Sequence, residues 1–116
     1  MLRFGMRIFN HSAVMFYGRR HADVRDDLLA WYAEAEKAVW KTPAEVRRQF
    51  PHASALPNHR IVFNLGGNRY RLIVSFNYSC GTCFIKFFGT HAQYDRIDAL
   101  TVDHTGVIHG KTTSRD

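Results

Sequence analysis

The side chains best suited to chemistry in this chain lie close together near its C-terminal end, in the sequence GTHAQYD. Thr90 and Gln93 have the spacing of a capping box, so a helix is predicted to begin at His91. Tyr94 and Asp95 then share a helix face with His91. A histidine oriented by a carboxylate, next to a phenol, suits general acid–base chemistry near neutral pH. The alternative is structural: an exposed histidine at a helix start, a tyrosine in the core, and an aspartate paired with an arginine.

Positive charge dominates the stretch before this motif. No acidic residue lies between Glu45 and Asp95. Arg71 and Lys86 are expected in the middle of neighbouring strands, where a hairpin register brings them within one or two residues of each other. Because no carboxylate is available in this window, a phosphate-binding surface would explain the cluster, and the alternative is a solvated sheet face. The cations of the window are Arg47, Arg48, Arg60, Arg69, Arg71 and Lys86.

These groups suit the cleavage of RNA without a metal. A general base removes the proton of a ribose 2′-hydroxyl, which attacks the adjacent phosphorus, and an acid protonates the leaving 5′-oxygen. Arg71 and Lys86 suit stabilisation of the charge that builds on the phosphate, and His91 and Tyr94 suit the proton transfers. No phosphate-binding glycine loop, nucleophile elbow or pair of carboxylates offers a competing chemistry.

Composition sets the broad limits. At 116 residues the chain is expected to form one domain, with a core over residues 6–102 and a polar tail over 103–116. A net charge of +6 favours nucleic acid, the ribosome or an acidic protein as partner. No apolar run is long enough to span a membrane and the N-terminus is charged too soon for a signal peptide, so a cytoplasmic protein is expected.

No metal or cofactor is expected from the cysteines and histidines. Cys80 and Cys83 form a single CxxC motif without a second pair of ligands, and the motif falls at a turn between two predicted strands rather than at a helix start. The histidines outside the GTHAQYD motif show no HxxxH or HxH spacing.

The hydrophobic pattern predicts helices followed by an antiparallel meander, which is an α+β fold. A short helix capped by Asn10 or Ser12 should run to Tyr17, where Gly18 stops it. The other predicted elements are a strand at Met6–Asn10 after a start at Met1–Gly5, helices at Ala22–Trp40 and Pro43–Phe50, a loop at His52–Asn58, strands at Arg60–Leu65, Tyr70–Tyr78 and Thr82–Phe88, and a helix from His91.

Three stretches of the chain read LLAWYAEAEKAVWKTPAEVRRQFP, RIVFNLGGNRYRLIVSFNY and FIKFFGTHAQYDRID. Together they resemble the HigB family of toxins from type II toxin–antitoxin systems, over roughly Met6 to Val102. The resemblance implies a RelE-like fold, with N-terminal helices on one face of a small antiparallel sheet and a short C-terminal helix. It also implies an mRNA interferase that cuts translated mRNA on the ribosome, and a HigA-type helix-turn-helix antitoxin as partner in a complex that represses its own operon.

The resemblance extends to the candidate site residues that lie in these motifs. RelE-like toxins vary in their active-site residues, and many work with Arg, Lys and Tyr and lack a catalytic histidine. Among the matching positions, we expect Arg71 and Lys86 to stabilise the phosphate and His91 and Tyr94 to transfer protons. Asp95 is expected to orient the histidine. The residues expected to bind RNA beside them are Arg60, Asn68 and Arg69. The chain departs from the family pattern at the hairpin turn that contains the two cysteines.

Two other functions fit the same sequence. One is a non-catalytic RNA- or ribosome-binding module that uses the basic sheet. The other is a degenerate toxin that acts only through binding of the antitoxin. Growth arrest and new mRNA ends after induced expression would separate the nuclease from both.

Overall fold

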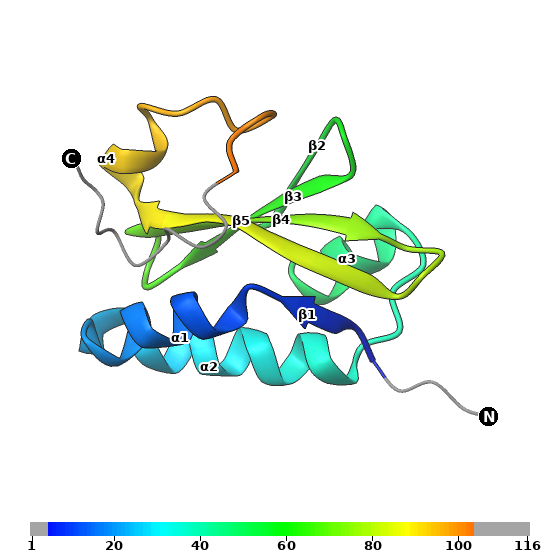
Figure 1. Cartoon of the computed structure of the whole chain (residues 1–116), viewed down its shortest axis with the longest axis horizontal. Helices are drawn as coiled ribbons and strands as arrows, with labels where there is room; N and C mark the ends of the chain where they lie inside the picture. Colours follow the sequence, from blue (N-terminus) through cyan, green and yellow to red (C-terminus); the bar gives the residue numbers. More distant parts are fainter. Residues whose placement is uncertain (1–4, 104–116) are drawn as a thin grey trace.

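The computed structural model describes residues 5–103, which form four helices and a five-stranded sheet (Figure 1). The predicted tail lies outside the described residues after Asp103, as does most of the predicted upstream start. The elements are β1 (Arg7–Phe9), α1 (His11–Arg19), α2 (Ala22–Lys37), α3 (Pro43–Gln49), β2 (Ser54–Leu56), β3 (Arg60–Leu65), β4 (Tyr70–Asn77), β5 (Thr82–Thr90) and α4 (His91–Tyr94).

The strands form one mixed sheet in the order β1-β5-β4-β3-β2. The pairs from β2 to β5 are antiparallel, as predicted, but β1 runs parallel to β5. The expectation of a purely antiparallel sheet is therefore wrong at this edge, although the α+β class is confirmed. The physical reason is that β1 pairs with a strand about 75 residues later, and three residues of strand carry no signal for the direction of such a distant partner.

The hairpin between β3 and β4 forms as the sequence predicts. Gly66, Gly67 and Asn68 all have positive φ angles, of 61°, 63° and 75°, which glycine and asparagine tolerate. The predicted loop before β3 is wrong in part, because it contains β2, which pairs with β3 through Ser54 and Val62. This short edge strand has no alternation of apolar and polar residues, so its sequence alone resembles a loop.

The start of α1 differs from the prediction. Asn10 has a φ of 70° and its side chain does not cap the helix; its Nδ2 donates to the carbonyl of Ile85 at 3.4 Å instead. Gly18 does not end the helix, which continues to Arg19. A Cβ at Gly18 would lie 2.8 Å from Leu28 Cδ1, so the glycine serves the close packing of α1 on α2.

The long helix α2 ends at Lys37, earlier than predicted, because Ala38 is extended. Trp31 of this helix is buried, whereas Val39, just beyond its end, is 47% exposed. The acidic residues of α2 connect it to the β3–β4 hairpin. Asp27 accepts a hydrogen bond from the backbone N–H of Gly66 at 2.8 Å, and Asp23 accepts one from the hydroxyl of Tyr70.

Thr42 and Pro43 begin α3 in the way their residue types favour. Thr42 Oγ1 accepts from the N–H of Glu45, and Pro43 occupies the first helical turn. The Glu45 carboxylate accepts from the N–H of Lys41 rather than from Thr42, so the reciprocal half of the capping box is displaced by one residue.

The sheet separates two hydrophobic clusters. The larger lies between the sheet and the helices α1 to α3, where Trp31 meets Phe63 edge to face at 5.4 Å (Figure 1). The opposite face, which we call the second face, carries a smaller cluster that the segment after β5 covers (Figure 1). This cluster consists of Val62, Ile73 and Phe87, covered by Leu56, Tyr94, Ile97, Ala99 and Val102. Among the described residues, no helix has the length and apolar character to cross a membrane.

Candidate functional site

His91 and Asp95 lie together at one end of the second face. Thr90 caps α4 through the N–H of Gln93, and the Gln93 side chain accepts from the N–H of Thr90, which completes the predicted capping box. His91 Nδ1 lies 3.2 Å from Asp95 Oδ2, with both side chains more than half exposed. The carboxylate therefore holds the ring by one nitrogen and leaves Nε2 as the nitrogen suited to proton transfer.

Arg71 and Tyr94 form a second pair beside the first. The guanidinium of Arg71 lies 5.8 Å from the centre of the Tyr94 ring, and the ring also contacts Phe87 at 6.5 Å. Arg71 is only 9% exposed, and its Nη1 donates to the carbonyls of Asn68 and Tyr70. Since Tyr94 lies one helical turn from His91, the two pairs belong to one end of the sheet.

Lys86 lies further along the same face than predicted. Arg71 pairs with Gly89, three residues beyond Lys86, so the two cations are not within one or two residues of each other. The cause is a β-bulge at Lys86, since Ile73 pairs with Phe87 whereas Val74 pairs with Ile85. A bulge adds one unpaired residue to a strand, which periodicity in the sequence does not reveal.

The expectation that these cations lack carboxylate partners is wrong for two of them. Lys86 Nζ lies 3.4 Å from Asp103 Oδ2, and Arg69 Nη2 lies 3.8 Å from Asp23 Oδ2. Both carboxylates lie outside the acid-free window of the sequence, and only the fold brings them in. Arg71 has no carboxylate within 4.0 Å among the residues that the structure describes.

Asn68 and Arg69 lie at the tip of the β3–β4 hairpin, as predicted. Both are exposed, and the carbonyl of Arg69 accepts the N–H of His91 at 2.8 Å. This bond ties the hairpin tip to the first residue of α4. The tip therefore lies next to the histidine and can extend the basic surface toward it.

Arg60, which was predicted to bind RNA, is buried under the segment after α4. It is 8% exposed, and its Nη1 donates to the carbonyls of Ala99 and Val102 at 3.1 and 2.7 Å. These bonds hold the segment after α4 against the second face. RNA binding by Arg60 stays a prediction, and its burial argues against it, because the covering segment supplies acceptors from about 40 residues away.

The two cysteines have opposite environments. Cys80 is exposed in the β4–β5 turn, and Cys83 is buried in β5, where burial raises the pKa of its thiol to about 12. Because the thiolate is the reactive form, iodoacetamide at mildly alkaline pH is expected to modify Cys80 and spare Cys83. Peptide mass spectrometry would measure this, with urea-unfolded protein as the control in which both react. Equal labelling of both thiols in folded protein would contradict the expectation.

The described residues contain no group of three or more His, Cys, Asp or Glu side chains that could hold a metal ion. The side chains that the second face does bring together are cations, aromatic rings and the His91–Asp95 pair. Such a set can bind a phosphate, stack a base and move protons.

Helices on one face of a small sheet, with a short capped helix after the last long strand, are consistent with a RelE-like toxin. The chain belongs to the HigB toxin family, whose sequence model is described as the RelE-like toxic component of a toxin–antitoxin system and matches residues 24–97. The match covers more than half of the chain and includes α2, the central strands and α4.

Individual relatives match about four-fifths of the chain. The "mRNA interferase toxin HigB" of Escherichia coli K12 is 26% identical over 98 residues, which is 82% of this chain and 93% of that protein. The "mRNA interferase HigB" of Escherichia coli O6:H1 (strain CFT073) is 31% identical over 94 residues, which is 79% of this chain and 91% of that protein. The Shigella flexneri "mRNA interferase HigB" is 26% identical over 98 residues.

Proposed function

We propose that this toxin is an endoribonuclease that cleaves mRNA at the end of the second face, with Arg71, His91 and Tyr94 as the reacting groups and Lys86 bound to a neighbouring phosphate. The observation that carries the proposal is the His91–Asp95 pair, at 3.2 Å, beside the stack of Arg71 on Tyr94. The names of the relatives support the same activity, since they are called mRNA interferases.

The proposed reaction is an internal transfer at phosphorus. His91 Nε2 removes the proton of a 2′-hydroxyl, the O2′–P bond forms, and the P–O5′ bond breaks. The leaving 5′-oxygen takes a proton from Tyr94. Arg71 carries the charge of the phosphate as it builds, and its bonds to two backbone carbonyls fix its position before substrate arrives. The residues themselves supply the acid, the base and the cation that stabilises the phosphate, so the proposal needs no cofactor.

Lys86 is proposed to bind a backbone phosphate next to the cleaved one. Its side chain is 20% exposed, and its ammonium already faces an anion, the carboxylate of Asp103. A phosphate would replace that carboxylate at the same ammonium group. Asn68 and Arg69 at the hairpin tip would hold the chain on the other side of His91.

The setting proposed for the reaction follows the family. The substrate is mRNA in translation on the ribosome in the cytoplasm. The cognate partner is a HigA-type helix-turn-helix antitoxin, which binds the toxin and represses the shared operon. Membership of a toxin–antitoxin family supports an antitoxin partner of some kind.

Induced expression in a bacterial host tests this proposal directly. We expect growth arrest and new mRNA 5′ ends inside translated codons, mapped by primer extension, because an interferase cuts the message within its reading frame. Co-expression of the adjacent helix-turn-helix protein should restore growth. Binding of RNA without new ends would support the non-catalytic module instead, and capture of the antitoxin without toxicity would support the degenerate toxin. Cleavage of free RNA by the purified protein would show that the ribosome is not required.

A further inference from the structure

The second face continues beyond the candidate site to an aromatic pair at the opposite end of β5. Phe9 of β1 and Phe84 of β5 are register partners, and their rings stack at 4.8 Å with an interplanar angle of 13°. Phe9 is 36% exposed and Phe84 is partly exposed, so the pair is open to solvent. Their neighbours Ile8 and Cys83 point into the main core, as alternation along a strand requires.

Each ring of this pair is flanked by a cation. The guanidinium of Arg7 lies 5.5 Å from the centre of the Phe9 ring, and the ammonium of Lys86 lies 5.6 Å from the centre of the Phe84 ring. Aromatic rings beside cations, on a rigid sheet, are the usual surface for single-stranded nucleic acid, because bases stack on the rings and phosphates meet the cations.

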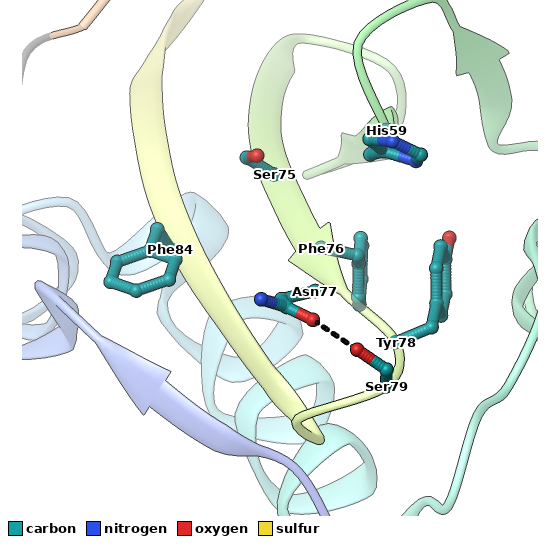
Figure 2. A pocket seen from close by; sticks show the side chains of 7 residues that line it. All are labelled: His59, Ser75, Phe76, Asn77, Tyr78, Ser79 and Phe84. Carbon is teal, nitrogen blue, oxygen red and sulfur yellow. Dashed lines mark hydrogen bonds between the residues drawn. The ribbon is translucent and has the colours of Figure 1, made fainter.

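A pocket of about 490 Å³ opens beside Phe84 (Figure 2). Ser75, Asn77 and His59 supply polar groups to its wall, and none of its lining residues is acidic. Asn77 Oδ1 accepts from Ser79 Oγ at 3.0 Å and from the N–H of Cys80 at 3.1 Å. Its amide nitrogen is turned away from Ser79 (Figure 2), and so remains a donor for a ligand.

The volume and chemistry of this pocket fit one nucleotide better than a protein side chain. It is within the range of small-ligand pockets, and its lining combines the aromatic residues Phe76, Tyr78 and Phe84 with a few polar groups that can read the edge of a base. Phe84 lies two residues before Lys86 on β5, about 7 Å along the strand, which connects the pocket to the lysine proposed to bind phosphate.

We propose that Phe84, with Phe9 beside it, forms a subsite that stacks an unpaired base of single-stranded RNA, and that Asn77, Ser75 and His59 select the base. This subsite rests on the proposed function, because it would hold a nucleotide further along the RNA from the cleaved phosphate, beyond the phosphate bound by Lys86. It gives the toxin a preference for certain sequences around the cut, read from the base rather than from the backbone.

The test uses the purified full chain and a fluorescently labelled short single-stranded RNA whose 2′-hydroxyls are methylated, so that it cannot be cut. Phe84→Leu keeps the apolar volume on β5 and removes the stacking surface. Fluorescence anisotropy should show about tenfold weaker binding, which corresponds to the loss of one stacked base. Asn77→Ala should change the order of affinities among oligonucleotides of different base rather than reduce all of them equally.

Phe16→Leu is the matched control, because Phe16 is 42% exposed on α1 and also has a cation, Arg20, 5.2 Å from its ring. It should bind RNA as the wild type does. Thermal melting confirms that each variant is folded. Equal RNA binding by wild type and folded Phe84→Leu would overturn the subsite, as would an equal loss in Phe16→Leu.

The outcomes separate this inference from the proposed function. A wild type that cuts mRNA, together with a Phe84→Leu variant that binds and cuts at the same positions, leaves the nuclease and removes the subsite. A wild type that cuts nothing, but whose RNA binding falls with Phe84→Leu, leaves the subsite and removes the nuclease. Weaker capture of the antitoxin with unchanged RNA binding would assign Phe84 to a protein interface and overturn the inference.

Discussion

Replacement of His91 by alanine is expected to lower mRNA cleavage by about 10²- to 10⁴-fold, the usual contribution of a general acid or base. The ring is exposed and its Nδ1 is held by Asp95 at 3.2 Å, so its loss removes a proton acceptor without opening the core. Primer extension after induction would measure the fall in new 5′ ends, and growth arrest should disappear with them. Single-turnover cleavage in a translating extract gives the rate directly.

Two variants sharpen this result. His52→Ala removes an exposed histidine from the turn after α3 and is expected to leave cleavage unchanged. Asp95→Asn keeps the size of the side chain but removes the carboxylate that orients the ring through Nδ1, so it should give a smaller loss than His91→Ala. Wild-type cleavage by a folded His91→Ala protein would contradict the assignment and leave Tyr94 with Arg71 as the groups to examine.

Replacement of Arg60 by leucine is expected to destabilise the protein by about 3 kcal/mol, since it removes two charge-assisted hydrogen bonds and leaves the carbonyls of Ala99 and Val102 without their donor. Arg60 is 8% exposed, so water does not readily replace it. Urea denaturation would measure the change as a lower midpoint. The segment after α4 should also become more accessible to proteases, because these bonds hold it to the second face.

The same variant separates a structural role from RNA binding at Arg60. RNA affinity should remain near the wild-type value at a temperature where Arg60→Leu is folded. Arg48→Leu is the matched control on the surface of α3, where the same loss of charge should change stability by less than about 0.5 kcal/mol. A stable Arg60→Leu protein with weakened RNA binding would return Arg60 to the RNA surface where the sequence alone had placed it.

Local sequence determined the elements that carry the proposed chemistry. The capping box of Thr90 and Gln93 fixed the start of α4, and helical spacing then fixed His91 against Asp95. Both depend on contacts within four residues, for which the chain itself supplies the partners. The β3–β4 hairpin followed in the same way from Gly66 and its neighbours with positive φ.

Strand register and ion pairs depend on residues far apart in the sequence, and here the predictions and the structure differ. The bulge at Lys86 moved it away from Arg71, and Asp103 and Asp23 supplied the carboxylates that the acid-free window lacks. The sequence predicts that Arg60 binds RNA, but the segment after α4 covers this residue and supplies its hydrogen-bond acceptors.

The aromatic pair at the opposite end of β5 from the proposed site also depends on residues that are distant in the sequence. Phe9 and Phe84 lie in different halves of the chain, and each by itself resembles an ordinary strand residue. Their stacking depends on the parallel pairing of β1 with β5, which no local pattern encodes. The sequence by itself thus determined the α+β class, the family resemblance and the His91–Asp95 motif, because these rest on local spacing. Only the tertiary structure decided which cations face a carboxylate, which one is buried and where a base could stack, because those depend on pairing between residues far apart in the chain.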